Sequence, residues 1–188
     1  WRWRGKATTA WQSSARPARP HGAMQHGRSR DATQSSATPQ RASRPELTTP
    51  RLLLRPFEPS DVASLPALCG DFEVSRMCMK VPHPYSLRDA QWFLDNVCAA
   101  ASSLTLAIVR RDSSAVIGCV SLDGLPLPSI GYWLGREHWG QGMATEAARA
   151  MVAHGFAELG LECITGTHFA ENPASGAVMT KLGFLRAE

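Results

Sequence analysis

The residues best placed to bind a charged ligand are the two glycines of the sequence Trp139-Gly140-Gln141-Gly142. They follow a strand-like run, residues 130–134, and precede apolar residues at helical spacing between 144 and 159. The first N–H groups of a helix have no partner within the helix, and the helix dipole adds positive charge there. Glycine lets the main chain approach a ligand or adopt a positive φ. This spacing predicts a cradle for phosphate or pyrophosphate at a strand-to-helix junction.

The loop matches neither of two common nucleotide-binding motifs. The chain contains no Gly-x-x-x-x-Gly-Lys-Ser/Thr, and Thr145 stands where the third glycine of Gly-x-Gly-x-x-Gly would be. Because Gly-x-Gly before a helix is also common as a plain tight turn, the loop alone leaves both interpretations open.

Four segments in the same order resemble a known family. The sequence from Trp139 to Ala147 resembles the acetyl-CoA loop of the GNAT N-acetyltransferases, most closely the ribosomal-protein N-terminal (RimJ/RimL-like) branch. An opening strand at 49–56, a central strand at 130–134 and a last helix from 172 to 184 also resemble that family. The resemblance covers residues 46–188. It implies an N-acetyltransferase that moves an acetyl group from acetyl-CoA to a primary amine by direct attack in a ternary complex.

The resemblance also implies which residues bind acetyl-CoA. The pantetheine arm would lie along the main chain of the central strand, at Trp133 and Leu134. Asn172 and Ser175 of the last helix would contact the cofactor as well. The pyrophosphate would lie on the main chain of the loop, at Trp139, Gly140, Gln141, Gly142, Met143, Ala144 and Thr145. No histidine or cysteine shows metal-ligand spacing, so no metal is expected.

The catalytic acid departs from the common pattern of the family. Many members protonate the leaving thiolate with a tyrosine on the last helix, but here that position is Met179, which cannot donate a proton. In the closer branch a serine near the start of the helix is the suggested substitute, which here is Ser175. The alternative is that Ser175 only caps the helix. Asn172 is likewise a cofactor contact, a cap, or both.

The general base is predicted to be Asp123, at the end of a strand beside the expected acceptor groove. The alternative is that Asp123 is a turn residue before Gly124. Glu146 and His138 are further candidates, although an acid in a first helical turn is also explained by the helix dipole.

Charge divides the chain into two parts. Residues 1–45 carry nine Lys and Arg against one acid, whereas the rest carries 11 against 15 and is therefore acidic. The first part contains no Leu, Ile, Val or Phe, so it is expected to be a disordered basic tail. It could bind nucleic acid, act as an organelle transit peptide, or be a non-native extension. The last is preferred, since the chain begins with Trp1 and Met24 offers a start.

The expected domain, residues 46–188, has an α/β (α+β) pattern. Strands at 51–55, 104–109, 115–122, 130–134 and 163–169 and helices at 60–69, 86–101, 144–159 and 173–182 indicate a mixed, mostly antiparallel sheet flanked by helices. The family's last two strands are missing after Gly183, so the strand 163–169 is expected to keep an unpaired edge and the chain to be C-terminally truncated.

The sequence also bears on the protein's location and on the alternative functions. Neither a secretory signal nor an apolar run of membrane-spanning length occurs, and the five scattered cysteines favour reduced core thiols, so a soluble cytoplasmic protein is expected. Two other functions stay open: a non-catalytic acyl-CoA binder on the same scaffold, and a nucleic-acid binder through the tail. The amine could belong to a protein N-terminus, another peptide, an amino acid or an aminoglycoside-like compound. The oligomeric state is not predicted.

Overall fold

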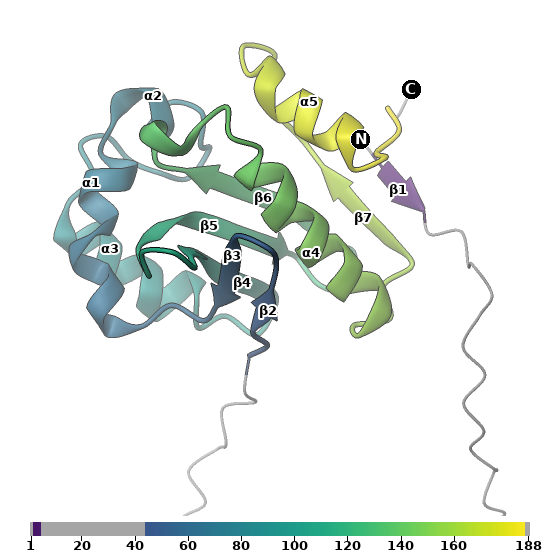
Figure 1. Ribbon diagram of the computed structural model, residues 1–188, viewed down its shortest axis with the longest axis horizontal. Helices are drawn as coiled ribbons and strands as arrows, with labels where there is room; N and C mark the ends of the chain where they lie inside the picture. The colour runs from purple at the N-terminus through teal and green to yellow at the C-terminus, as the bar shows by residue number, and fades with distance from the viewer. Residues whose placement is uncertain (1, 5–43, 187–188) are drawn as a thin grey trace, which may run out of the picture. The chain divides into compact units, whose positions relative to one another are not determined.

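The computed structural model describes residues 2–4 and 44–186, in which seven strands form one sheet (Figure 1). Their order across the sheet is β1-β7-β6-β5-β4-β3-β2. All neighbouring pairs are antiparallel except β6 and β7, which are parallel. The strands are β1 (Arg2–Arg4), β2 (Leu47–Thr48), β3 (Leu52–Arg55), β4 (Ser103–Arg110), β5 (Val116–Asp123), β6 (Ser129–Leu134) and β7 (Cys163–Gly166).

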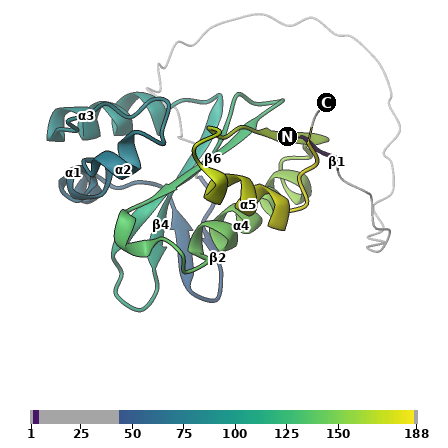
Figure 2. The same ribbon diagram turned by 90° about the horizontal axis from the view of Figure 1, so that it is seen from above.

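Helices cover both faces of this sheet. The long helix α4 (Met143–Ala157) and α5 (Pro173–Lys181) lie on one face, and α1 (Leu65–Cys69), α2 (Phe72–Ser75) and α3 (Leu87–Trp92) lie towards the other (Figures 1 and 2). Three short helical segments complete the chain: η1 (Pro59–Ala63), η2 (Phe93–Val97) and η3 (Arg136–His138). None of the helices in the described residues is long and apolar enough to cross a membrane.

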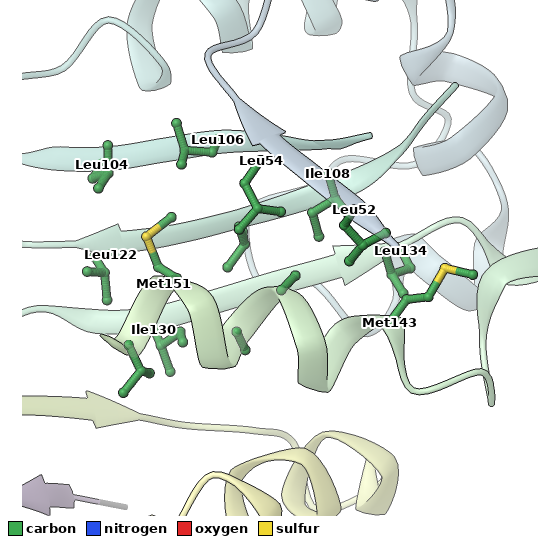
Figure 3. Packing of buried hydrophobic residues seen from close by; sticks show 14 of the residues in the cluster. Leu52, Leu54, Leu104, Leu106, Ile108, Leu122, Ile130, Leu134, Met143 and Met151 are labelled. Atoms are coloured by element: carbon green, nitrogen blue, oxygen red, sulfur yellow. The ribbon is translucent and has the colours of Figure 1, made fainter. Parts of the chain in front are cut away.

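The main core lies between the sheet and α4 (Figure 3). Alternate strand residues such as Leu106, Ile108 and Leu122 are fully buried and face Met151 and its neighbours on the helix. Burial of each such side chain contributes about 1.5–3 kcal/mol. On the opposite face a smaller cluster of Leu65, Ala90 and Leu94 packs with Trp133. The two faces of β6 therefore belong to different cores.

The strands β6 and β7 pair over only two positions, Ser129 with Thr165 and Ile130 with Gly166. Beyond them β7 ends, while β6 continues to Leu134. We call this point of divergence the fork. Figure 1 shows the two strands separating there. The fork leaves main-chain groups of residues 131–134 without a neighbouring strand on the β7 side in the part of the chain that the structure describes.

Several boundaries differ from those expected. The helix expected from Ser60 begins as a 3-10 turn with Glu58 as its N-cap. The carboxylate of Asp61 accepts from the Glu58 N–H at 2.8 Å and is also held by Arg55, with Nη1–Oδ2 at 2.8 Å and Nη2–Oδ1 at 2.9 Å. Ser86 caps α3 as predicted, through a capping box with Asp89, but the helical segment ends at Val97. The strand expected over 163–169 ends at Gly166.

The outer edge of β7 is paired with β1, in the register Arg2 to Thr165 and Arg4 to Cys163. The expectation of a fully unpaired edge on this strand is therefore wrong. Residues 2–4 also lie inside the segment expected to have no regular structure, whereas residues 1 and 5–43 of that segment lie outside the described residues. The chain thus brings its first strand beside one of its last.

Candidate active site

The two glycines of the predicted cradle lie at the start of α4. Gly140 and Gly142 have φ of +73° and +75°, a conformation that disfavours any side chain. A Cβ added to Gly140 would meet nothing within 4 Å, so the main chain there is open. Gly142 is the N-cap of α4, and no side chain caps this end in the described structure. The first helical hydrogen bond is Glu146 N–H to Gly142 O, so the N–H groups of residues 143–145 are left for a ligand. These features fit a bound pyrophosphate.

Side chains around the predicted cradle form hydrogen bonds within the loop itself. The indole Nε1 of Trp139 donates to the carbonyl of Leu134 at 2.8 Å, and the side chain of Gln141 donates to the carbonyl of Glu137 at 2.9 Å. Met143 and Thr145 are buried beneath the helix start. Of the predicted cofactor residues in the loop, all can therefore offer main-chain groups, while these side chains serve the loop itself.

Ser175 lies at the fork and contacts β6. Its hydroxyl shares a 2.8 Å hydrogen bond with the hydroxyl of Tyr132, which also donates to the Ser175 carbonyl at 3.0 Å. The helix cap is instead Asn172, whose Oδ1 accepts from the Ser175 N–H at 3.1 Å. The hydroxyl of Ser175 is therefore not used as a cap. Burial raises the pKa of Tyr132, although the bond with Ser175 opposes this, so its phenol stays protonated at neutral pH.

Asp123 faces the other side of the sheet. Its Oδ2 accepts from the hydroxyl of Ser121 at 3.1 Å. A Cβ placed on Gly131 would lie 2.9 Å from Ser121 Oγ and 3.7 Å from Asp123 Oδ2, so the glycine keeps space in front of both groups. Gly131 is also the first residue of β6 beyond its last pairing with β7. The carboxylate thus lies beside Gly131, on the β5 side of β6.

The candidate acid and the candidate base are placed by successive residues of β6. Neighbouring side chains of a strand point to opposite faces. Gly131 faces Ser121 and Asp123, whereas Tyr132 packs on the α4 core and reaches Ser175. The first residues of β6 beyond the fork therefore have a carboxylate near one face of the strand and two hydroxyls near the other.

The alternative bases are engaged elsewhere. Partial burial raises the pKa of Glu146, but hydrogen bonds from Thr49 and Arg51 outweigh this and leave it lowered. Its carboxylate accepts from Thr49 Oγ1 at 2.7 Å and pairs with Arg51 Nε at 2.7 Å. Such a carboxylate binds a proton poorly. His138 Nε2 lies 3.3 Å from a carboxylate oxygen of Glu137. In the described residues no group of His, Cys, Asp and Glu could hold a metal ion.

Met179 is a core residue, with 1% of its surface exposed. Its Cε and Sδ would lie 3.0 and 3.2 Å from a Cβ on Gly166, so the side chain packs against the end of β7. It contributes no polar group to the fork. Neither Tyr132 nor Arg51 was predicted from the sequence to have a role, although both lie in strands that resemble the family. Their partners are 43 and 95 residues away along the chain, and no local pattern encodes such contacts.

Comparison with known proteins identifies the family to which this chain belongs. The model of the acetyltransferase (GNAT) domain family matches residues 51–185. The uncharacterized N-acetyltransferase YoaA of Bacillus subtilis is 31% identical over 147 residues, which are 74% of this chain and 82% of YoaA. The crystal structure of a GNAT-family acetyltransferase from Bacillus anthracis has a TM-score of 0.69 at 24% identity, covering 76% of this chain and 85% of that one. RimL, a ribosomal L7/L12 alpha-N-protein acetyltransferase solved with coenzyme A, has a TM-score of 0.68 at 19% identity, covering 77% and 86%.

The chain belongs to the GNAT acetyltransferase family. The expected fold, an α/β arrangement with a mixed, mostly antiparallel sheet flanked by helices, is confirmed. The expected enzyme class, an acetyl-CoA-dependent N-acetyltransferase, is confirmed with it.

Proposed function

We propose that the protein transfers an acetyl group from acetyl-CoA to a primary amine by direct attack, with the reaction centred on the fork. The observation that carries this proposal is that Asp123 and the Tyr132–Ser175 pair lie on opposite faces of β6. Asp123 lies next to Gly131, and the hydroxyl pair begins at the next residue, Tyr132. An amine that enters from the Asp123 face would meet the fork opposite the hydroxyl pair.

The cofactor residues are proposed from the main-chain groups that are available. The N–H groups of residues 140–145 would hold the pyrophosphate, and those of Trp133 and Leu134 would hold the pantetheine arm along the open edge of β6. Asn172 would contact the cofactor in addition to capping α5, which its side chain already does. Acetyl-CoA, when bound, supplies a thioester whose carbon–sulfur bond is exchanged for a carbon–nitrogen bond to the amine.

Asp123 would take the proton that the attacking amine loses, directly or through water. Ser175 would give its hydroxyl proton to the departing sulfur. Tyr132 would replace that proton through the 2.8 Å bond between the two hydroxyls, and water would then reprotonate Tyr132. The carboxylate of Asp123 would also attract a cationic amine before the amine is deprotonated.

The amine itself is proposed only as a class. The similarity to RimL at 19% identity concerns the fold, so a ribosomal-protein N-terminus is one candidate among primary amines. The test is an acetylation assay on N-terminal peptides, amino acids, polyamines and aminoglycosides, with cofactor binding measured in parallel. Turnover of one class and its loss in Asp123→Asn would support the proposal. Tight acetyl-CoA binding without turnover of any amine would favour a non-catalytic acyl-CoA binder, for which Met179 in place of the usual tyrosine is the motive.

A further inference from the structure

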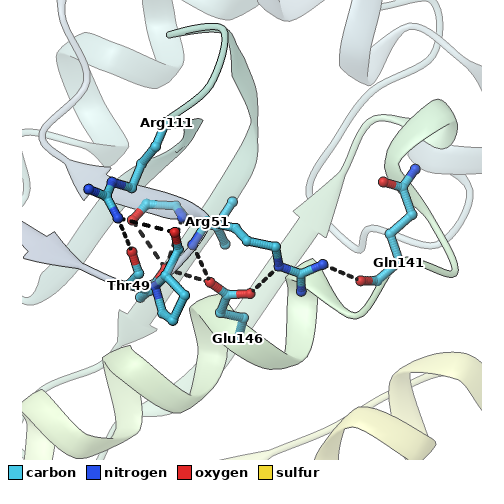
Figure 4. Close-up of polar contacts among 7 residues, drawn as sticks. Thr49, Arg51, Arg111, Gln141 and Glu146 are labelled. Carbon is cyan, nitrogen blue, oxygen red and sulfur yellow. Dashed lines mark hydrogen bonds and ion pairs between the residues drawn. The ribbon is translucent and has the colours of Figure 1, made fainter.

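The turn between β2 and β3 is attached to the first turn of α4 through one carboxylate (Figure 4). Glu146 Oε1 accepts from Thr49 Oγ1 at 2.7 Å and from the Arg51 N–H at 2.9 Å. Its Oε2 pairs with Arg51 Nε at 2.7 Å. The Glu146 side chain is only 16% exposed, and both of its oxygens are occupied. This carboxylate therefore fixes both the main chain and the guanidinium of Arg51.

The same guanidinium reaches the cofactor loop. Arg51 Nη1 donates to the carbonyl of Gln141 at 2.9 Å, and Nη2 lies 3.6 Å from the position of a Cβ on Gly142. Figure 4 shows Arg51 extended between Glu146 and Gln141. One planar side chain thus joins the helix to the residue before the N-cap glycine. We call Arg51 and Glu146 together the clamp.

Holding the Gln141 carbonyl has a geometric effect on the next residue. The peptide unit is planar and trans, so the carbonyl of Gln141 and the N–H of Gly142 point in opposite directions. A carbonyl drawn towards Arg51 turns the Gly142 N–H away from it. Gly142 is left-handed and could adopt many other conformations without this restraint.

We propose that Arg51 and Glu146 are positioning residues for acetyl-CoA, which set the orientation of the main-chain donors in the loop without touching the reacting atoms. This inference rests on the same cofactor loop as the proposed function. The alternative is that the clamp only attaches β2 and β3 to α4 and contributes to stability. The two roles differ in whether cofactor affinity changes in variants that are folded.

Glu146→Gln is the decisive variant because its electrostatic and geometric effects would change the affinity for coenzyme A in opposite directions. Removing a negative charge near the loop would by itself make the anionic coenzyme A bind more tightly. Loss of the charged partner of Arg51 would instead release the guanidinium and loosen the loop. We expect binding of coenzyme A, measured by calorimetry without an amine, to weaken about tenfold, as for residues coupled in one network.

Arg51→Gln should weaken coenzyme A binding to a similar degree, and the double variant should bind no more weakly than either single variant. Arg51→Lys keeps a charge near Glu146 but cannot fork to Gln141, so it should keep the thermal stability of wild type and still bind more weakly. The matched control is Arg76→Gln, which breaks the exposed 2.7 Å pair with Glu73 on α2 and should leave affinity unchanged. In steady-state kinetics the clamp variants should raise the KM for acetyl-CoA more than they lower kcat.

Two results would overturn the inference. If folded Arg51→Lys and Glu146→Gln bind coenzyme A as tightly as Arg76→Gln, the clamp is structural only and the proposed function stands. If wild type does not bind coenzyme A, both the proposed function and this inference fail.

Discussion

At the scale of single residues, the hydroxyls of Tyr132 and Ser175 can form their hydrogen bond in either direction. When Tyr132 donates to the Ser175 carbonyl, the Ser175 proton is directed at the phenol oxygen. When Tyr132 donates to the Ser175 hydroxyl oxygen, the Ser175 proton is available to another acceptor. The second arrangement is the one that can protonate a leaving group.

Ser175→Ala and Tyr132→Phe should therefore each lower kcat by roughly 10²-fold, at the lower end of what general acid–base catalysis contributes. The affinity for coenzyme A should change little in either variant. Met179→Ala is the contrasting change, since removing this buried side chain should cost about 2–5 kcal/mol of stability. Unchanged kcat in both hydroxyl variants would show that the pair only joins β6 to α5.

Glu146 should make stability depend on acid. Its pKa is below the ordinary value of 4.5, because the hydrogen bonds from Thr49 and Arg51 outweigh the effect of burial. A lowered folded-state pKa adds stability that is fully present above about pH 4.5 and is lost as the pH falls through the folded value. Melting temperatures between pH 6 and pH 3 should therefore fall less steeply in Glu146→Gln than in wild type. Glu158→Gln, an exposed glutamate at the end of the same helix, should melt like wild type.

At the scale of elements, the cradle depends on backbone conformation more than on side chains. Gly142 is left-handed at φ +75°, whereas the side chain of Gln141 only reaches the carbonyl of Glu137. Gly142→Val forces a β-branched residue into this region at a cost of about 1–3 kcal/mol. If the loop shifts to relieve that strain, coenzyme A should bind roughly 5- to 150-fold more weakly. Gln141→Ala should bind coenzyme A nearly as well as wild type. Comparable losses of affinity in the two variants would show that the Gln141 side chain itself contacts coenzyme A.

Much of the element order could be predicted because it is encoded locally. Ser86, Asn172 and Pro173 begin helices where their side chains predict, and α4 follows its apolar spacing. The start of η1 at Pro59 was not predicted, because the side chain of Asp61 accepts from the Glu58 N–H upstream of it instead of capping a helix that begins after Ser60. The contact of Tyr132 with Ser175 depends on how β6 and α5 are placed, and the sequence alone does not carry that information.

At the scale of the whole molecule, the family match over residues 51–185 contains every residue proposed for the site. The division into a basic segment, residues 1–45, and a domain, residues 46–188, stays a hypothesis. The strand β1 bears on it, because it pairs along the outer edge of β7. An unpaired strand edge is a template for association between chains.

Deletion of residues 1–45 should therefore leave coenzyme A binding intact but increase self-association, because the β7 edge loses β1. Sedimentation velocity at several concentrations measures the change, and calorimetry measures the binding. A variant in which residues 6–43 are replaced by a flexible Gly/Ser linker of equal length, long enough to join the two edges of the sheet, should remain as monodisperse as the full chain. Equal association of the two shortened chains would mean that β1 does not protect this edge.

The short pairing between β6 and β7 at the fork also affects how easily the sheet opens locally. Only two residue pairs join β7 to β6, whereas seven residue pairs join β4 to β5. Opening of the arm formed by β7 and α5 would break few sheet hydrogen bonds, so amide protons of β7 should exchange with deuterium sooner than those of β4 and β5. Coenzyme A lying in the fork would contact both arms and should slow exchange in β7 selectively. Coenzyme A bound in the gap would then join β6 to β7 where no main-chain hydrogen bonds do so, and would complete the sheet at that point.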